Sequence, residues 1–175
     1  FRWFAELIDT YNTESLRNTM TEALERDAEG ELKDTAIKLL RAADFNISDY
    51  HFSIKQGSPK NIPLPPGISI DKELLDNIKS FELNLYHDVE TDNGIESVPL
   101  PFRMESNGTQ LYFAYCPAIM TALKTGKTIV IDEIDSGLHP MLVRHLVGIF
   151  NNKETNPNGA QLIFNTHDID LLDLE

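Results

Sequence analysis

The chain has 175 residues, a formal net charge of −13 and a pI near 4.7. This length is sufficient for one domain with a hydrophobic core, and an acidic chain repels the phosphate backbone, so we do not expect this segment to bind nucleic acid directly. The single cysteine, Cys116, excludes an internal disulfide, and no apolar run approaches the roughly 20 residues that cross a membrane. We expect a cytoplasmic protein without a membrane segment.

The first 46 residues have a helical pattern. Asn12 to Ser15 supply N-cap chemistry ahead of apolar residues at helical spacing, and a second helix is predicted over residues 31–43. A short strand is predicted over residues 47–55. We therefore expect residues 1–55 to form a helical, lid-like segment with one strand. Because the chain opens on Phe1 and not on methionine, we also expect it to have been cut from a larger protein.

A break and a hairpin follow this helical segment. Residues 56–70 are rich in proline and glycine, which predicts a flexible loop. Residues 81–87 alternate between apolar and polar side chains, and Asp92-Asn93-Gly94 is a strong turn signal. The chain is then predicted to return over residues 95–100 as the second strand of an antiparallel hairpin. Prolines within and after that strand predict an edge position or an early end.

From residue 102 onward, helices and apolar strands alternate. The pattern predicts helices over residues 111–123 and 141–150, a buried strand over residues 128–133 and a second apolar strand over residues 160–165. This order is typical of an α/β fold with parallel core strands. The predicted fold class is thus α/β, with parallel core strands, an antiparallel hairpin and an N-terminal helical segment.

Two adjacent carboxylates end the predicted buried strand over residues 128–133. Asp132 and Glu133 stand directly after the apolar run Ile129 to Ile131, where unpaired acids are costly unless a cation or a reaction requires them. Mg²⁺ prefers carboxylate, water and phosphate oxygens, and a glutamate at a strand tip can polarise a water molecule for attack on a phosphoryl group. The alternative is that both acids merely cap the next turn.

Three further groups of residues are candidates. His167 follows the next strand and is expected at the same sheet edge, where it could bind a γ-phosphate or position a water. Ser106, Asn107, Gly108 and Thr109 precede a helix and could bind an anion, although an ordinary N-cap is the better interpretation of the local sequence. Asp135 and Ser136 lie in a tight turn after the acids.

Taken in order, ESNGTQ, TIVIDE, IDSGLHP and FNTHD resemble the signature motif, Walker B strand, D-loop and switch-histidine loop of an ABC-type ATPase head. The chain looks most like bacterial AAA-type ATP-binding proteins of abortive infection or phage defence, which are related to overcoming-lysogenization-defect (OLD-like) and chromosome-maintenance (SMC-like) ATPases. The resemblance implies a partial P-loop NTPase fold and identifies residues 71–175 as its C-terminal lobe.

The resemblance also implies a role for each matching residue. Asp132 would bind Mg²⁺, Glu133 would be the general base and His167 would contact the γ-phosphate of ATP. The signature residues Ser106, Asn107, Gly108 and Thr109 would face the γ-phosphate of ATP held by a second copy in a homodimer. Asp135 and Ser136 would communicate across that dimer. An effector protein or domain is expected as a further partner.

The other half of such a site is missing from the sequence. No G-x-x-x-x-G-K-[ST] phosphate loop (Walker A) occurs, and Thr125 to Thr128 precedes a strand and does not open a helix. We expect the missing loop N-terminal to Phe1, and the fragment alone to be inactive. Two alternatives remain: a non-enzymatic interaction module that kept the fold, or a metal-dependent nuclease or phosphatase, for which Asp168 is the obvious further acid.

Overall fold

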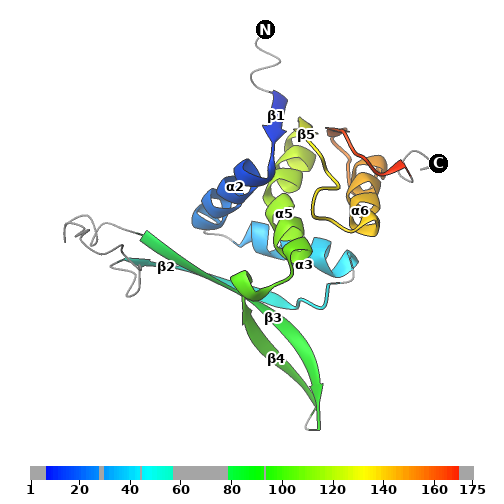
Figure 1. Ribbon diagram of the computed structural model, residues 1–175. Coiled ribbons are helices and arrows are strands. Elements are labelled where there is room, and N and C mark those ends of the chain that lie inside the picture. The colour runs from blue at the N-terminus through cyan, green and yellow to red at the C-terminus, as the bar shows by residue number, and fades with distance from the viewer. Residues whose placement is uncertain (1–6, 28–29, 44, 57–78, 93, 170–175) are drawn as a thin grey trace, which may run out of the picture.

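The computed structural model describes residues 7–27, 30–43, 45–56, 79–92 and 94–169 (Figure 1). In chain order, its elements are β1 (Ile8–Tyr11), α2 (Thr13–Arg26), α3 (Glu31–Ala42), β2 (Asp49–Gln56), β3 (Lys79–Thr91), β4 (Gly94–Pro101), the short helix η1 (Phe102–Met104), α5 (Asn107–Thr125), β5 (Thr128–Ile131), α6 (Pro140–Asn151) and β6 (Gln161–Phe164). The strands form a parallel sheet in the order β1-β5-β6 and an antiparallel sheet in the order β2-β3-β4. The predicted α/β fold is therefore confirmed.

Most predicted elements occur where the sequence places them. Asn12 caps α2 by accepting the amide of Ser15, while the Ser15 hydroxyl accepts the amide of Asn12, so that a capping box starts the helix. β4 is an edge strand that ends at Pro101, as its prolines predict. The predicted loop over residues 56–70 lies, apart from residue 56, outside the described residues.

The helical assignment of the first 46 residues is wrong for residues 8–11. These residues form β1, which pairs in parallel with β5 in a register that sets Ile8 opposite Thr128 and Tyr11 opposite Ile131. Four residues are too few to show a strand period, and the hydrogen bonds that make them a strand come from a partner far along the chain. Only the tertiary pairing distinguishes this segment from a helical lead-in.

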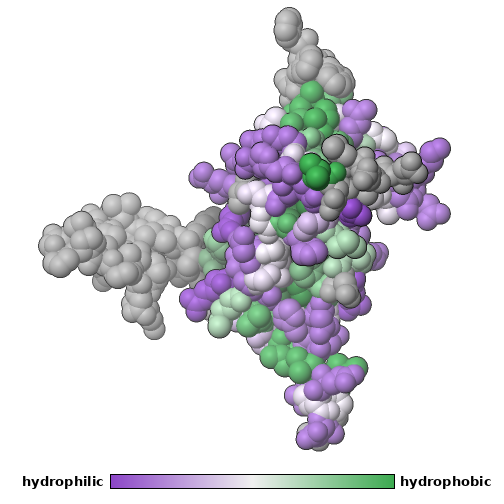
Figure 2. All heavy atoms as spheres, turned by 45° about the vertical axis from the view of Figure 1, so that its right-hand side comes forward, coloured by the Kyte–Doolittle hydropathy of each residue, from purple (hydrophilic) through white to green (hydrophobic). Residues whose placement is uncertain are grey.

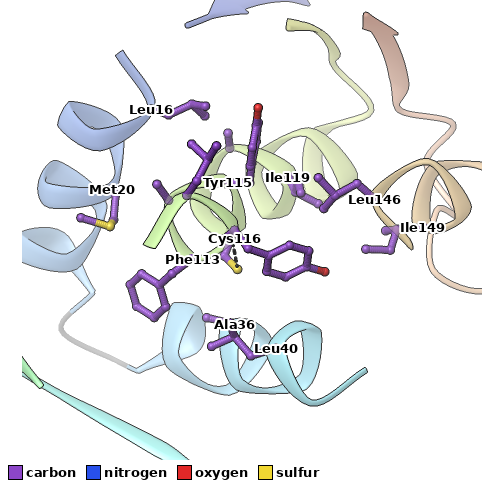
Figure 3. Packing of buried hydrophobic residues seen from close by; sticks show 14 of the residues in the cluster. Leu16, Met20, Ala36, Leu40, Phe113, Tyr115, Cys116, Ile119, Leu146 and Ile149 are labelled. Carbon is purple, nitrogen blue, oxygen red and sulfur yellow. Dashed lines mark hydrogen bonds between the residues drawn. The ribbon is translucent and has the colours of Figure 1, made fainter. Parts of the chain in front are cut away.

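Helix α5 lies at the centre of the core. Every residue from Leu111 to Ile119 is buried, and Figure 3 shows α5 surrounded by side chains from α2, α3 and α6. A helix that is apolar on all sides is stable only when neighbours cover all of its sides. Cys116 is fully buried here, and burial raises the pKa of its thiol to about 12. A buried thiol that keeps its proton is inert, so Cys116 has a structural role in the core.

One face of the parallel sheet packs on this core and the other is open. Ile129 and Ile131 point into the core with exposures of 1% and 2%. The intervening row, Thr10–Val130–Ile163, runs across the opposite face, where Ile163 is 53% exposed. That row lines an open depression that reaches Asp132 and Asn165. The described residues therefore cover only one face of this sheet. Parallel sheets are normally covered on both faces, so a further cover for the second face is expected.

The edge of the sheet is open as well. Within the described ranges, β6 pairs with β5 on one side and with no strand on the other.

None of the helices in the described segments combines the length and the apolar character that crossing a bilayer requires.

Candidate functional site

Asp132, Glu133 and Asn165 meet at the carboxyl edge of the parallel sheet. β5 ends at Ile131 and β6 at Phe164, so the residues that follow both strands emerge together. Asn165 donates through Nδ2 to Asp132 Oδ1 at 2.6 Å, and its Oδ1 accepts the backbone N–H of Glu133. Asn165 therefore holds both acidic residues. Asn165 is not among the site residues predicted from the sequence, although its position directly after an apolar strand is a signal that could have identified it.

We refer to residues 132–135 as the acidic turn. It contains Glu133, whose φ is 50°. Among all described residues other than glycine, this is the one with a positive φ. For a residue with a Cβ this conformation costs about 1 kcal/mol or more, and it persists only where neighbouring contacts enforce it. The hydrogen bond from Asn165 is such a contact. The result is a carboxylate that is 55% exposed at the carboxyl edge of the sheet.

His167 lies beside Glu133. Its Nε2 is 3.7 Å from Glu133 Oε1, and its side chain is 84% exposed. The parallel strands thus bring together the two side chains that the sequence proposes as catalytic. The exposed ring is accessible to a ligand, while a hydrogen bond to Asp135 holds the main chain of the residue.

Asp135 supplies that backbone anchor. Its Oδ2 accepts the N–H of His167 at 3.2 Å. Desolvation would raise the pKa of Asp135, but hydrogen bonds from its own amide, the His167 amide and the Thr166 side chain outweigh it and leave the pKa lowered. The exposed Ser136 donates its N–H to the Glu133 carbonyl at 2.8 Å. Asp135 and Ser136 thus support the acidic turn within this chain, and their communication across a dimer stays a prediction.

A second group of predicted residues forms the entry turn of α5, residues 105–110. Ser106 is the N-cap: its Oγ accepts the Thr109 N–H at 3.0 Å and lies 2.7 Å from Thr109 Oγ1. The N-cap interpretation of these residues is therefore confirmed. An anion-binding role stays a prediction that is compatible with it, since the first amides of a helix have no intrahelical acceptor.

The entry turn packs against the loop that follows the acidic turn. Gly137 has φ +86°, and a Cβ built on it would lie 2.9 Å from Asn107 Nδ2. A Cβ on Gly108 would in turn lie 3.6 Å from the Gly137 carbonyl oxygen. Two of the motifs recognised in the sequence, ESNGTQ and IDSGLHP, are thus in contact, at the end of the loop away from Asp132.

The segment Thr125 to Thr128 is not a phosphate loop. Gly126 is the left-handed C-cap of α5, at φ +68°, and Thr128 begins β5. Between them, Lys127 pairs with Asp9 of β1 at 3.1 Å. Its ammonium is therefore used within the sheet, as expected for a turn that leads into the strand.

The acidic turn suits a hard cation such as Mg²⁺, most of whose ligands are waters and phosphate oxygens and not protein side chains. The described residues hold no cluster of three or more His, Cys, Asp or Glu side chains that could bind a metal. Asp132 has one carboxylate oxygen on Asn165, and its other oxygen accepts no hydrogen bond from the described residues. One carboxylate, completed by waters and phosphate oxygens, is a mode that Mg²⁺ accepts. The nuclease or phosphatase alternative, which needs further acids, gains no support.

A known family matches nearly the whole chain. A family model described as "AAA domain, putative AbiEii toxin, Type IV TA system" matches residues 6–173. No curated protein matches the chain.

Proposed function

Since the chain belongs to this family of AAA domains, P-loop ATPase-like units, we propose that it is the C-terminal part of an ABC-type ATPase head that hydrolyses ATP as a homodimer. One observation carries the proposal. Asn165 holds Asp132 and Glu133 at the sheet edge to which the next strand also brings His167. Hydrolysis of a nucleotide uses three such groups. One acid binds the metal, a second acid accepts a proton from the attacking water, and an imidazole contacts the phosphate.

Each of these residues has a distinct task. Asp132 would hold the Mg²⁺ of a bound Mg–ATP, and the metal would supply neutralising charge to the phosphates. Glu133 accepts the proton of the attacking water, with its carboxylate oriented by the left-handed backbone conformation. His167 donates a hydrogen bond to the γ-phosphate from an exposed ring whose main chain Asp135 holds. Asn165 is an added positioning residue.

The entry turn of α5 acts on a nucleotide bound by the second copy. Ser106, Asn107, Gly108 and Thr109 stand at the N-terminus of a helix of 19 residues, whose dipole and first amides favour an anion. Their contact with Gly137 couples this turn to the loop that carries Asp135 and Ser136. We assign Asp135 and Ser136 the task of relaying closure of the dimer to the acidic turn.

The phosphate loop comes from a further part of the polypeptide. The β6 edge and the Thr10–Val130–Ile163 face, which the described residues leave uncovered, border the acidic turn, and they are the surfaces on which such a part would pack. ATP binding and hydrolysis belong to the whole cytoplasmic protein and not to this chain alone. An output in phage defence or DNA maintenance, through an effector, accords with the toxin named in the family description.

The proposal is tested by Glu133→Gln in the full-length protein. Loss of the general base lowers the rate of ATP hydrolysis by about 10²–10⁴-fold, while ATP binding remains and the ATP-bound dimer lasts longer. Turnover is measured by phosphate release and dimer lifetime by light scattering. Glu154→Gln, an exposed acid in the loop before β6, is the matched control and leaves both unchanged. Undiminished turnover in Glu133→Gln rejects this residue as the base.

Two titrations separate the alternatives. Mg–ATP added to the present chain shows negligible affinity, and tight binding by this chain would overturn the need for a separate phosphate loop. A full-length protein that neither binds nor hydrolyses ATP would instead identify the fold as a non-enzymatic interaction module.

A further inference from the structure

The β3–β4 hairpin extends away from the rest of the molecule (Figure 1). We define its outer part, residues 86–99, as the arm. All residues of β4 from Gly94 to Pro99 are exposed, so the outer half of the hairpin receives little support from the core. Figure 2 shows the hairpin end as a narrow projection of mixed polar and apolar character. Its orientation therefore depends on contacts near its base.

His87 provides one of these contacts. It lies on β3 opposite Val98, and its Nε2 is 2.7 Å from Glu105 Oε1. The Glu105 side chain is only 6% exposed and that of His87 is 25% exposed. Within the described part of the chain, His87 is the hydrogen-bond partner of this carboxylate. A carboxylate buried to this degree is costly without a donor, so the pair is a strong constraint at the base of the arm.

Glu105 is also the first residue of the entry turn of α5. Its N–H donates to the Phe102 carbonyl at 3.1 Å, and its own carbonyl accepts Gln110 Nε2 at 2.9 Å. The next residue, Ser106, caps the helix. The main chain of Glu105 is thus tied to the turn, whereas its side chain is tied to the arm. Moving His87 would move the residue that precedes the cap.

We propose that His87 is a positioning residue for the entry turn of α5, which it fixes through Glu105 so that the arm and the ATP site of the partner copy are mechanically linked. The proposal rests on the proposed function, because the entry turn acts on the nucleotide of the second copy. His87 itself touches no nucleotide. Its loss therefore lowers kcat and the stability of the ATP-bound dimer, while the affinity of an isolated subunit for ATP stays the same.

The first experiment measures the entry turn in the present chain. In His87→Ala, the backbone amides of Thr109 and Gln110, which both donate to Ser106, exchange with solvent about tenfold faster or more, because a hydrogen bond to a buried carboxylate is lost. His87→Gln, whose amide can donate from the position of Nε2, restores most of the protection. His51→Ala is the matched control, since His51 is an exposed histidine of the same sheet. Amides of α3 report global opening, and their exchange in His87→Ala changes less than that of Thr109 and Gln110.

The second experiment measures turnover in the full-length protein. His87→Ala lowers kcat by about ten- to a hundredfold, His87→Gln retains most of it and His51→Ala retains all of it. Unchanged amide exchange in His87→Ala overturns the proposal whatever the turnover, and unchanged kcat overturns the link to the ATP site. A third outcome is faster amide exchange in His87→Ala together with a full-length protein that has no ATPase activity. That outcome would overturn the proposed function, but it would support the positioning of the entry turn by His87.

Discussion

Asn165 uses both ends of one amide group to organise the acidic turn. The Nδ2 group fixes the Asp132 carboxylate, and the Oδ1 atom holds the N–H of Glu133, whose backbone is left-handed. A hydrogen bond in this position must offset a conformational cost of about 1 kcal/mol or more. Asp135 has the equivalent task for His167. The chemistry at this edge thus depends on two residues that position others as much as on the residues that would react.

Gly137 gives a residue-level prediction. In Gly137→Ala, the new Cβ meets Asn107 Nδ2 at 2.9 Å on a backbone with φ +86°. We expect a loss of about 1–2 kcal/mol in the free energy of unfolding, measured by urea denaturation. Gly148→Ala is the control, because Gly148 lies inside α6 with no atom within 4 Å of its added Cβ. That variant is stabilised by up to about 1 kcal/mol. Equal stability of the two variants would contradict the contact between the two motifs.

At the scale of elements, α5 organises the molecule through its packing with α2, α3 and α6. At the interface with α6, Tyr112 Oη lies 2.6 Å from His145 Nδ1, and the two rings stack with centroids 6.0 Å apart. Burial raises the pKa of Tyr112, so its hydroxyl keeps its proton over the pH range in which a histidine titrates. Burial also lowers the pKa of His145 below 6.5. The helix pair therefore requires a neutral histidine.

This requirement gives a pH prediction. The unfolded chain binds a proton at His145 near pH 6.5 and the folded chain only at lower pH. The contribution of His145 to stability is then complete above pH 6.5 and is lost as the pH falls toward the lowered pKa of the folded state. Its slope is at most about 1.4 kcal/mol per pH unit.

The measurement is urea denaturation at several pH values from 7 down to 5, with His145→Gln as the comparison. Glutamine can still accept from the Tyr112 hydroxyl but does not titrate, so the stability of the variant falls less steeply than that of the wild type below pH 6.5. Parallel curves for the two proteins would show that His145 is as easily protonated when folded as when unfolded.

At the scale of the whole molecule, the parallel sheet is incomplete among the described residues. Its core face packs on α5 and α6, while Thr10, Val130 and Ile163 cross a face that no described element covers. The acidic turn lies at the border of this face. A part of the polypeptide that covered this face would reach the carboxyl edge of the sheet. We propose that Asp132 and Glu133 act on a bound phosphate at that edge.

Ile163 tests this incompleteness. In the present chain, Ile163→Ser lowers the free energy of unfolding by about 1 kcal/mol or less, because the side chain is already 53% exposed. In the longer protein that we propose, the same change costs about 2–5 kcal/mol, as for a core residue. Ile129→Ala, on the buried face, costs that much in both proteins and serves as the control. Equal, small costs for Ile163→Ser in both would show that the face stays open.

The sequence by itself determined the alternation of helices and strands after residue 102, the hairpin, and the acids at the end of β5. These features are local: a capping box, a turn signal, edge prolines and an apolar run that ends in carboxylates can each be recognised within a few residues. The resemblance of four short motifs to an ABC-type head also led to the family that the comparison shows.

Only the tertiary structure decided which distant residues cooperate. β1 is a strand because β5 pairs with it, Asn165 matters because β6 lies beside β5, and the His87–Glu105 contact exists because a hairpin packs near the start of α5. None of these pairings has a local signal, since their hydrogen bonds join segments that are far apart in the chain. The sequence shows which groups could react, and long-range packing decides where they are held.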